Sequence, residues 1–179
     1  KAFYLAIGCQ GGRKAGVPGE EAAGIQTAVN LLRTVGDNEN YKMSGRTVVI
    51  GGGNVAIDVA RAAARTDAVS VDMYCLESRS EMPALPEEIQ EAEEEHIAIH
   101  NGYGPREILV KDGRAVGVVF KKCLRVFDEN HRFAPQYDEN DTITVETDHV
   151  LLSIGQSIQW GNLLAGTAVV TRPNGTVET

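Results

Sequence analysis

The run VVIGGGNVAIDVARAAA, residues 48–64, constrains the fold more than any other part of the sequence. It begins with apolar residues typical of a buried strand, passes through three consecutive glycines and continues with the spacing of an amphipathic helix. Glycine is destabilising inside regular structure, so its use at a strand–helix junction indicates a backbone requirement that side chains would prevent. The sequence therefore predicts a tight strand–turn–helix unit here.

The glycines have the spacing of a Rossmann βαβ unit, G-x-G-x-x-A, with Gly51, Gly53 and Ala56 at the three small positions. In that unit the first glycine allows the turn, the second lets the backbone approach a pyrophosphate, and the third small residue lets helix and strand pack closely. The helix N-terminus directs unpaired N–H groups at the phosphates. The candidate diphosphate site is Gly51, Gly52, Gly53, Asn54, Val55 and Ala56.

Asn54 is expected to cap the helix, because asparagine is favoured at that position, and it is also a candidate for contact with the pyrophosphate. The alternative interpretation of the whole segment is a tight turn in another kind of α/β protein. The context favours a dinucleotide, since a strand precedes the glycines and a helix and a second strand follow them.

An acidic residue follows where a ribose would be recognised. Glu77 ends the next predicted strand, about 20 positions beyond the fingerprint, which is the expected distance. A carboxylate there accepts hydrogen bonds from both ribose hydroxyls of NAD and repels the 2′-phosphate of NADP. Ser78 and Arg79 extend this candidate site, and Arg79 leaves contact with a phosphate open. We predict NAD(H) in preference to NADP(H); the alternative is that Glu77 is an exposed strand-end residue without a ligand.

The rest of the chain predicts an α/β domain followed by antiparallel strands. Apolar runs and helical spacing indicate strands at 2–7, 46–50, 69–77 and 97–100 and helices at 25–35, 54–66 and 86–95. After residue 105, two β-rich runs are joined by Asp112-Gly113, a hairpin signal, and 142–155 supplies two more strands. The expected fold is a Rossmann-like βαβαβ unit with an antiparallel β-meander of three or four strands.

Composition excludes several other classes of protein. The net charge of −8 leaves no basic surface for nucleic acid, and no apolar run is long enough for a membrane-spanning helix. Three distant cysteines without a C-x-x-C motif provide no local redox dithiol or metal-ligand set, and they fit the reducing cytoplasm. None of the five tyrosines begins a Tyr-x-x-x-Lys pair, which argues against a short-chain dehydrogenase.

Three segments together resemble the small-subunit family of glutamate synthase. They are GRTVVIGGGNVAIDVARAA, SRSEMPALPEEIQEAEEE and TDHVLLSIGQ. More broadly, nearly the whole chain is similar to flavoproteins with two dinucleotide-binding domains. The resemblance implies an NAD(P)H-dependent FAD oxidoreductase in which the nicotinamide passes a hydride to flavin N5. The cofactors supply that chemistry, so no residue of this chain is expected to be catalytic.

In such flavoproteins the NAD(P) domain is inserted into the FAD domain. FYLAIGCQ and VLLSIGQ resemble the two crossings between the domains. The resemblance therefore places Gly8 and Gly155 at the hinge, with Ile154 and Gly155 beside the nicotinamide. It divides the chain into an FAD-domain linker and strand (1–23), the NAD(P)-binding domain (24–150), and the return crossing with the start of the FAD domain (151–179).

Several features of the family are missing from this sequence. It has no second glycine fingerprint for FAD, no late Gly-Asp segment, and no cysteine-rich region for iron–sulfur clusters. We therefore expect FAD, and iron–sulfur domains or subunits, as partners within a longer parent protein, and we expect the chain alone to be inactive. Where the family often has two arginines this chain has Leu76 and Glu77, which again favours NAD(H). A non-enzymatic NAD(H)-sensing module is the alternative function.

Overall fold

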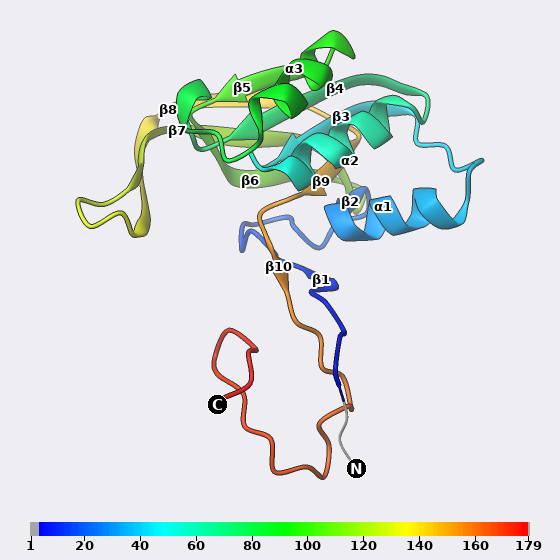
Figure 1. The fold of residues 1–179 in the computed structure, drawn as a ribbon. Helices are drawn as coiled ribbons and strands as arrows, with labels where there is room; N and C mark the ends of the chain where they lie inside the picture. The colour runs from blue at the N-terminus through cyan, green and yellow to red at the C-terminus, as the bar shows by residue number, and fades with distance from the viewer. Residues whose placement is uncertain (1–3, 179) are drawn as a thin grey trace.

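A five-stranded parallel sheet carries the glycine-rich run at its centre (Figure 1). The computed structural model describes residues 4–178. The strand order is β2-β9-β3-β4-β5, and each strand pairs in parallel with its neighbours. In that order the strands span Ile25–Thr27, His149–Leu152, Gly45–Ile50, Ala68–Cys75 and Ala98–Asn101.

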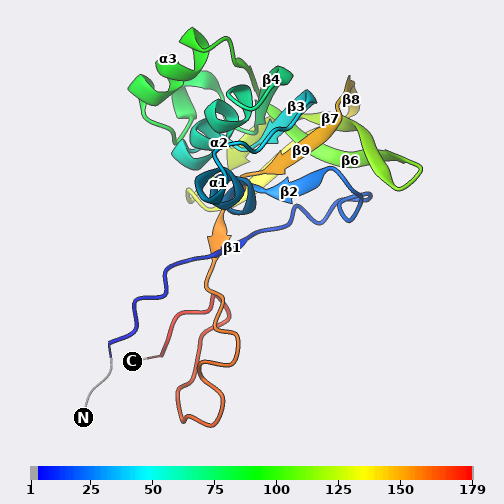
Figure 2. The same ribbon diagram turned by 90° about the vertical axis from the view of Figure 1, so that its right-hand side faces the viewer.

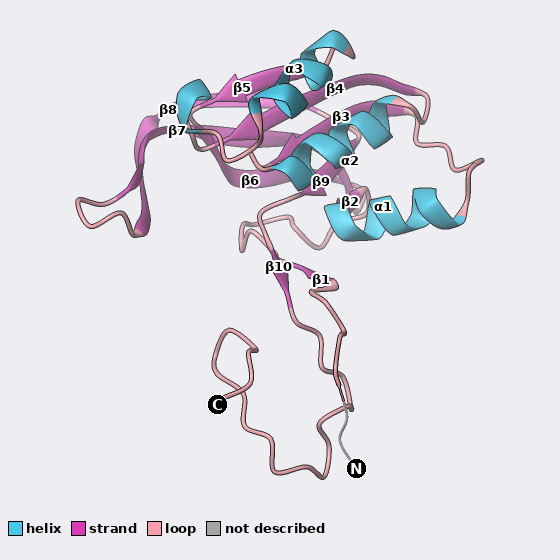
Figure 3. Ribbon diagram, viewed as in Figure 1, coloured by secondary structure: helices cyan, strands magenta, loops and turns pink. Residues whose placement is uncertain are grey.

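Helices cover one face of this sheet, namely α1 (Ala28–Asp37), α2 (Asn54–Ala64) and α3 (Pro86–Glu94). A short 3-10 turn, Arg79–Glu81, lies between β4 and α3. Figure 3 shows the helices gathered on one side of the strands. Among residues 4–178, no helix combines the length and the apolar character that crossing a membrane requires.

A three-stranded antiparallel sheet covers the opposite face, formed by β6 (Tyr103–Lys111), β7 (Arg114–Phe127) and β8 (Phe133–Glu146). Alternate side chains of β3 pack into the two cores on opposite faces of the sheet. Val49 packs in the core under the helices, and Val48 and Ile50 pack in the core under the antiparallel sheet. A strand buried on both faces has no polar side, which explains the continuous apolar run in the sequence.

The two terminal segments run side by side away from the sheets (Figures 1 and 2). Near the main body they are joined by the short antiparallel pair β1 (Gly11–Gly12) and β10 (Gln156–Ser157). The backbone N–H of Arg13 donates to the carbonyl oxygen of Gly155 at 3.0 Å, which extends this pairing. The N-terminal and C-terminal segments of the described chain therefore leave the two sheets side by side at the same place.

Three expected elements differ from the structure. The helix expected at 25–35 begins at Ala28, because residues Ile25–Thr27 pair with β9 as a strand. The fourth strand expected in the meander, His149–Leu152, instead returns to the parallel sheet between β2 and β3, so the sheet continues two residues past the boundary expected at 150. A short apolar run at 25–27 fits both a helix and a strand, and the run at 149–152 does not show which sheet it joins, so the pairing partner decided both cases.

The strand expected at 2–7 is also corrected. Residues 4–7 have no regular structure, while residues 2 and 3 lie outside the described part of the chain. The remaining predicted elements are confirmed to within two residues at their ends, apart from the runs after residue 105, where the strands are longer than expected. The mixed fold of a parallel sheet, helices and an antiparallel meander is therefore the one predicted.

The buried strand β3 contains a polar residue, Thr47, whose contribution to stability can be tested. Thr47 is 1% exposed, and its hydroxyl has no hydrogen-bond partner among residues 4–178. Because folding removes this hydroxyl from water without replacing the hydrogen bond, we expect Thr47→Val to raise the free energy of unfolding by about 1 kcal/mol. Chemical denaturation followed by circular dichroism measures the change.

Thr147 provides the matched control. It is equally buried, but its hydroxyl lies 2.9 Å from the carbonyl oxygen of Arg46 and 2.8 Å from that of His149. Thr147→Val should therefore lower the free energy of unfolding, by about 1–3 kcal/mol. Destabilisation by both substitutions would show that the Thr47 hydroxyl is also satisfied.

Candidate functional site

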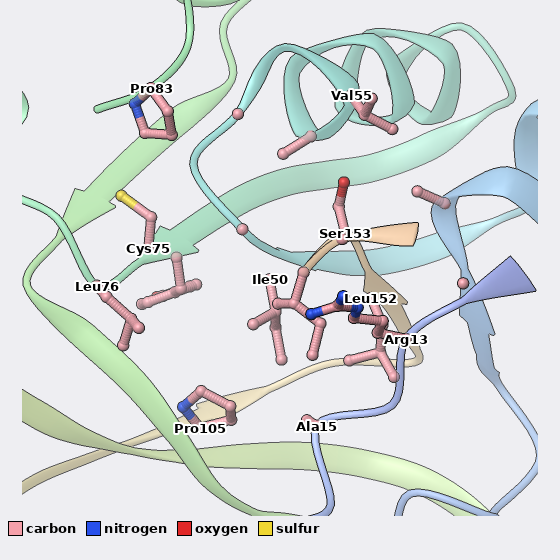
Figure 4. Close-up of a pocket in the computed structure, with 18 of the residues that line it drawn as sticks. Arg13, Ala15, Ile50, Val55, Cys75, Leu76, Pro83, Pro105, Leu152 and Ser153 are labelled. Atoms are coloured by element: carbon pink, nitrogen blue, oxygen red, sulfur yellow. The ribbon is translucent and has the colours of Figure 1, made fainter. Parts of the chain in front are cut away.

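A cavity of about 750 Å³ opens at the carboxyl ends of β3, β4 and β9 (Figure 4). From β3 the chain continues to β4 and β5 on one side of the sheet, whereas β9 and β2 lie on the other side. Ligands of open α/β sheets bind at such a reversal of strand order. The volume is within the range of small-molecule and cofactor sites.

The first two glycines of the turn are required by contacts within the protein. At Gly51, φ is +142°, and a Cβ atom would lie 2.3 Å from the carbonyl oxygen of Ser153. At Gly52, a Cβ atom would lie 2.9 Å from Oε2 of Glu77 and 3.0 Å from the Cβ of Cys75. The turn therefore lies directly against the ends of β9 and β4.

Gly53 has a different environment. The nearest atom to its Cβ position is Cγ of Pro83 at 4.0 Å, and the residue lines the cavity. It occupies the N-cap position of α2, and no side chain caps this helix. Its carbonyl oxygen accepts from the N–H groups of Ala56 and Ile57, so the earlier N–H groups at the helix start have no intrahelical acceptor. Gly53 thus leaves the helix N-terminus open toward the cavity.

Asn54 does not cap α2, contrary to expectation. It is the first residue of the helix, and its Oδ1 accepts a hydrogen bond from the backbone N–H of Leu85 at 2.8 Å. The side chain therefore ties the start of α2 to the loop before α3. Val55 lines the cavity, whereas Ala56 is fully buried where the helix packs on the sheet.

Glu77 is the one member of the expected ribose site that lines the cavity. Its carboxylate lies against Gly52, beside the glycine turn. Ser78 instead donates a hydrogen bond to Glu81, and the guanidinium of Arg79 lies 2.7 Å from Oε2 of Glu93 on α3. The structure therefore brings Glu77 to the cavity and leaves Ser78 and Arg79 outside its wall.

Residues that sequence reasoning missed form the other end of the cavity. Thr27 is the N-cap residue of α1, and Ala28 and Val29 of the first helical turn line the cavity. The hydroxyl oxygens of Thr27 and Ser153 are buried and have no hydrogen-bond partner within residues 4–178. Figure 4 shows Ser153 with its oxygen pointing toward the start of α2. A second helix N-terminus thus faces the same cavity as that of α2.

No single sequence signal marked these residues. Thr27 fell inside the expected helix, so its place at a helix start could not be recognised. The expected nicotinamide residues Ile154 and Gly155 do line this end of the cavity, beside Arg13. The side chain of Arg13 comes within 3.3 Å of the Cβ position of Gly155.

Cys75 lines the cavity but is not a nucleophile. Burial, and next the negative charge of Glu77, raise the pKa of this thiol to about 11. The thiolate is the reactive form of cysteine, so at neutral pH Cys75 is protonated and inert. Cys75 therefore contributes a neutral side chain to the cavity wall.

The sheet order, the glycine turn and the helix layer together define a Rossmann-like α/β domain of the type found in FAD- and NAD(P)-binding oxidoreductases. The chain belongs to the pyridine nucleotide-disulphide oxidoreductase family, whose model matches residues 1–179. This confirms the broader resemblance drawn from the sequence.

Three curated relatives from bacteria are about equally similar to the chain. The NADP(+)-dependent formate dehydrogenase subunit beta of Moorella thermoacetica is 31% identical, over 87% of this chain and 23% of its own length. The NADPH-Fe(3+) oxidoreductase subunit beta of Geobacter sulfurreducens is 32% identical, over 87% and 24%. The glutamate synthase [NADPH] small chain of Azospirillum brasilense is 31% identical, over 86% and 34%. The chain thus spans about a quarter to a third of these relatives, and the resemblance to the glutamate synthase small chain is confirmed.

Solved structures confirm the fold. Mycobacterium tuberculosis FprA in complex with NADPH superposes with a TM-score of 0.67 at 20% identity, over 85% of this chain and 49% of that one. Thioredoxin reductase of T. acidophilum gives a TM-score of 0.66 at 19% identity, over 93% and 48%. The chain therefore corresponds to about half of each of these structures.

The contacts of the turn predict unequal effects of adding a methyl group to its glycines. Gly51→Ala forces a side chain into a positive-φ conformation and against a carbonyl oxygen, so the free energy of unfolding should fall by at least about 2 kcal/mol. Gly53→Ala has room and should lower it by less than about 1 kcal/mol. Denaturant titrations of both variants provide the measurement, and equal losses would contradict the assigned geometry.

Proposed function

We propose that the cavity binds a nicotinamide dinucleotide, with its diphosphate at the N-terminus of α2. The observation that carries this proposal is the open position of Gly53, which leaves a helix start without a side-chain cap facing a cavity of suitable volume. Unpaired N–H groups and the positive end of the helix dipole together favour an anion at such a position.

The two ends of the cavity fit the two halves of a dinucleotide. Toward β4, the Glu77 carboxylate can accept hydrogen bonds from the hydroxyls of the adenosine ribose. Toward β9, Ile154 and Gly155 line the side proposed for the nicotinamide. The Ser153 hydroxyl, which has no hydrogen-bond partner within residues 4–178, belongs to the cavity wall at that end and can donate to a polar group such as a carboxamide.

In the full-length protein we propose that this domain presents the nicotinamide to FAD, so that the parent is an NAD(P)H-dependent flavoprotein oxidoreductase. A bound nicotinamide supplies the hydride chemistry, while the residues of this chain bind and orient it. Family membership supports this function. Two of the relatives are named as beta subunits and one as a small chain, which supports partner subunits as well.

The position of the terminal segments supports an inserted domain. Because β1 and β10 pair and lead both segments away together, they are suited to be the two crossings into an FAD domain. Gly8 and Gly155 have φ of +63° and +109°, and we propose that they flank the hinge. Within this proposal the NAD(P)-binding unit extends to Leu152, the end of β9.

Direct titration tests the binding proposal. We expect the chain of residues 1–179 to bind NADH or NADPH with micromolar affinity, and we expect Gly53→Ala to weaken that binding at least about tenfold, because its methyl group occupies the approach of the diphosphate. Nucleotide fluorescence or calorimetry measures the affinity. An unchanged affinity in a folded Gly53→Ala variant would place the diphosphate elsewhere.

The preference for NAD(H) over NADP(H) is a separate proposal that depends on Glu77. The names of the relatives specify NADP(+) or NADPH, which argues against the preference. The approach of the Glu77 carboxylate to Gly52 supports it, because a carboxylate beside the glycine turn would repel a 2′-phosphate on a ribose bound there. Arg79 is held by Glu93 and does not line the cavity.

Charge reversal at Glu77 tests this preference. We expect the unmodified chain to bind NADH more tightly than NADPH, and we expect Glu77→Arg to shift the ratio of the two dissociation constants toward NADPH by about tenfold or more. Glu39→Arg is the matched control, because it makes the same change in net charge at an exposed loop position outside the cavity wall. Tighter NADPH binding by the unmodified chain would reject the preference.

A further inference from the structure

The distal part of the β7–β8 hairpin, residues 122–138, forms an arm that leaves the antiparallel sheet. Pairing between β7 and β8 shifts register at Lys121/Lys122, Cys123/Arg125 and Arg125/Phe127. Bulges of this kind bend a hairpin and re-aim its side chains, and they are frequent next to binding sites. Figure 1 shows the arm, in yellow-green, projecting from the ends of the strands.

The arm carries aromatic side chains that the core does not use. Phe133 is 66% exposed and Phe127 is 45% exposed, and their rings meet edge to face with centroids 6.3 Å apart. Phe133 lines the cavity together with Pro135 and Tyr137, whereas Phe127 does not. An exposed phenylalanine in a cavity wall is a surface suited to a flat apolar ligand group.

The base of the arm is fixed beside the candidate ribose site. A Cβ atom at Gly104 would lie 2.6 Å from Cε1 of Tyr137 and 2.8 Å from Cδ2 of Leu76, so glycine lets these two side chains close over β6. Leu76 directly precedes Glu77. The Nζ of Lys121 lies 4.2 Å from the centroid of the Tyr137 ring, which further holds that ring in place.

We propose that the arm forms the adenine subsite of the nicotinamide dinucleotide site, with the ring of Phe133 stacking on the base. This inference rests on the proposed function. The base is joined directly to the ribose, and Leu76, Tyr137 and Phe133 line the same cavity as Glu77, so a ribose at Glu77 leaves the base in a cavity walled by these side chains. Aromatic side chains stack well on nucleobases, and an edge-to-face partner such as Phe127 can steady the stacking ring.

Binding measurements on three nucleotides test the subsite. Phe133→Ala should weaken binding of NADH and of ADP-ribose to similar extents, by about tenfold or more, as expected for loss of one base–aromatic stack. Reduced nicotinamide mononucleotide has no adenine, so its affinity should change less than twofold. Phe133→Tyr should keep the affinity for NADH, because it keeps an aromatic ring at the same position.

Phe127→Ala is the matched control. It removes the same side chain from the same ring pair but not from the cavity wall, so its effect on NADH affinity should stay below about threefold. A loss as large as that of Phe133→Ala would show that the arm acts through its packing and would reject stacking. Because Phe133 is mostly exposed, its substitution should leave thermal unfolding unchanged.

The outcomes separate this inference from the proposed function. If the unmodified chain binds neither NADH nor NADPH, the proposed function is wrong and the adenine subsite with it. If it binds NADH, and both Gly53→Ala and Glu77→Arg alter that binding while Phe133→Ala does not, the dinucleotide site stands and the adenine subsite is rejected.

Discussion

The contact between the glycine turn and the end of β9 is the constraint on which the site depends. The N–H of Gly51 donates to the carbonyl oxygen of Tyr74 at 2.9 Å, and the N–H of Ser153 donates to that of Ile50 at 2.8 Å. The ends of β3, β4 and β9 are thus tied together at Ile50 and Gly51, and Gly51 has no side chain. Any Cβ atom there would separate β3 from β9, and with it the two helix starts that face the cavity.

Those helix starts give an acidic chain a local environment that favours an anion. The net charge of −8 repels a diphosphate at long range, but salt screens charges beyond about 8 Å. The cavity wall itself contains the N-terminal ends of α1 and α2, together with Arg13, Lys14 and Glu77. Lys14 pairs with Glu21, so its charge is partly offset. The backbone dipoles at the two helix starts therefore add a positive contribution beside these charged side chains, and the net charge of the chain does not include it.

The sequence predicted those features that are determined locally. The turn, helix α2 and Glu77 lie within one βαβ unit, so residue spacing was sufficient to place them. The start of α1, with Ala28 and Val29, and Ser153 are brought to the same cavity by parallel pairing of β2 with β9, a contact between segments more than 100 residues apart that leaves no local pattern. The prediction that Asn54 caps α2 was wrong for another reason. Asparagine can cap a helix or accept a hydrogen bond from another segment, and here the tertiary contact with the N–H of Leu85 decided between the two.

The arm was unpredictable for a third physical reason. Its sequence is polar and turn-like, and its position depends on irregular register between β7 and β8, which alternation of residues does not encode. As a consequence, the two ends of the cavity differ in how much their side chains contribute to the core. At the β9 end, Leu152 is 3% exposed and belongs to the core, so changes there disturb the sheet. At the opposite end, Phe133 contributes little to the core, so changes there are expected to leave the fold intact. Under the proposed assignment, substitutions at Phe133 would change recognition of the adenosine half, while the strand ends that face the proposed nicotinamide position would remain fixed.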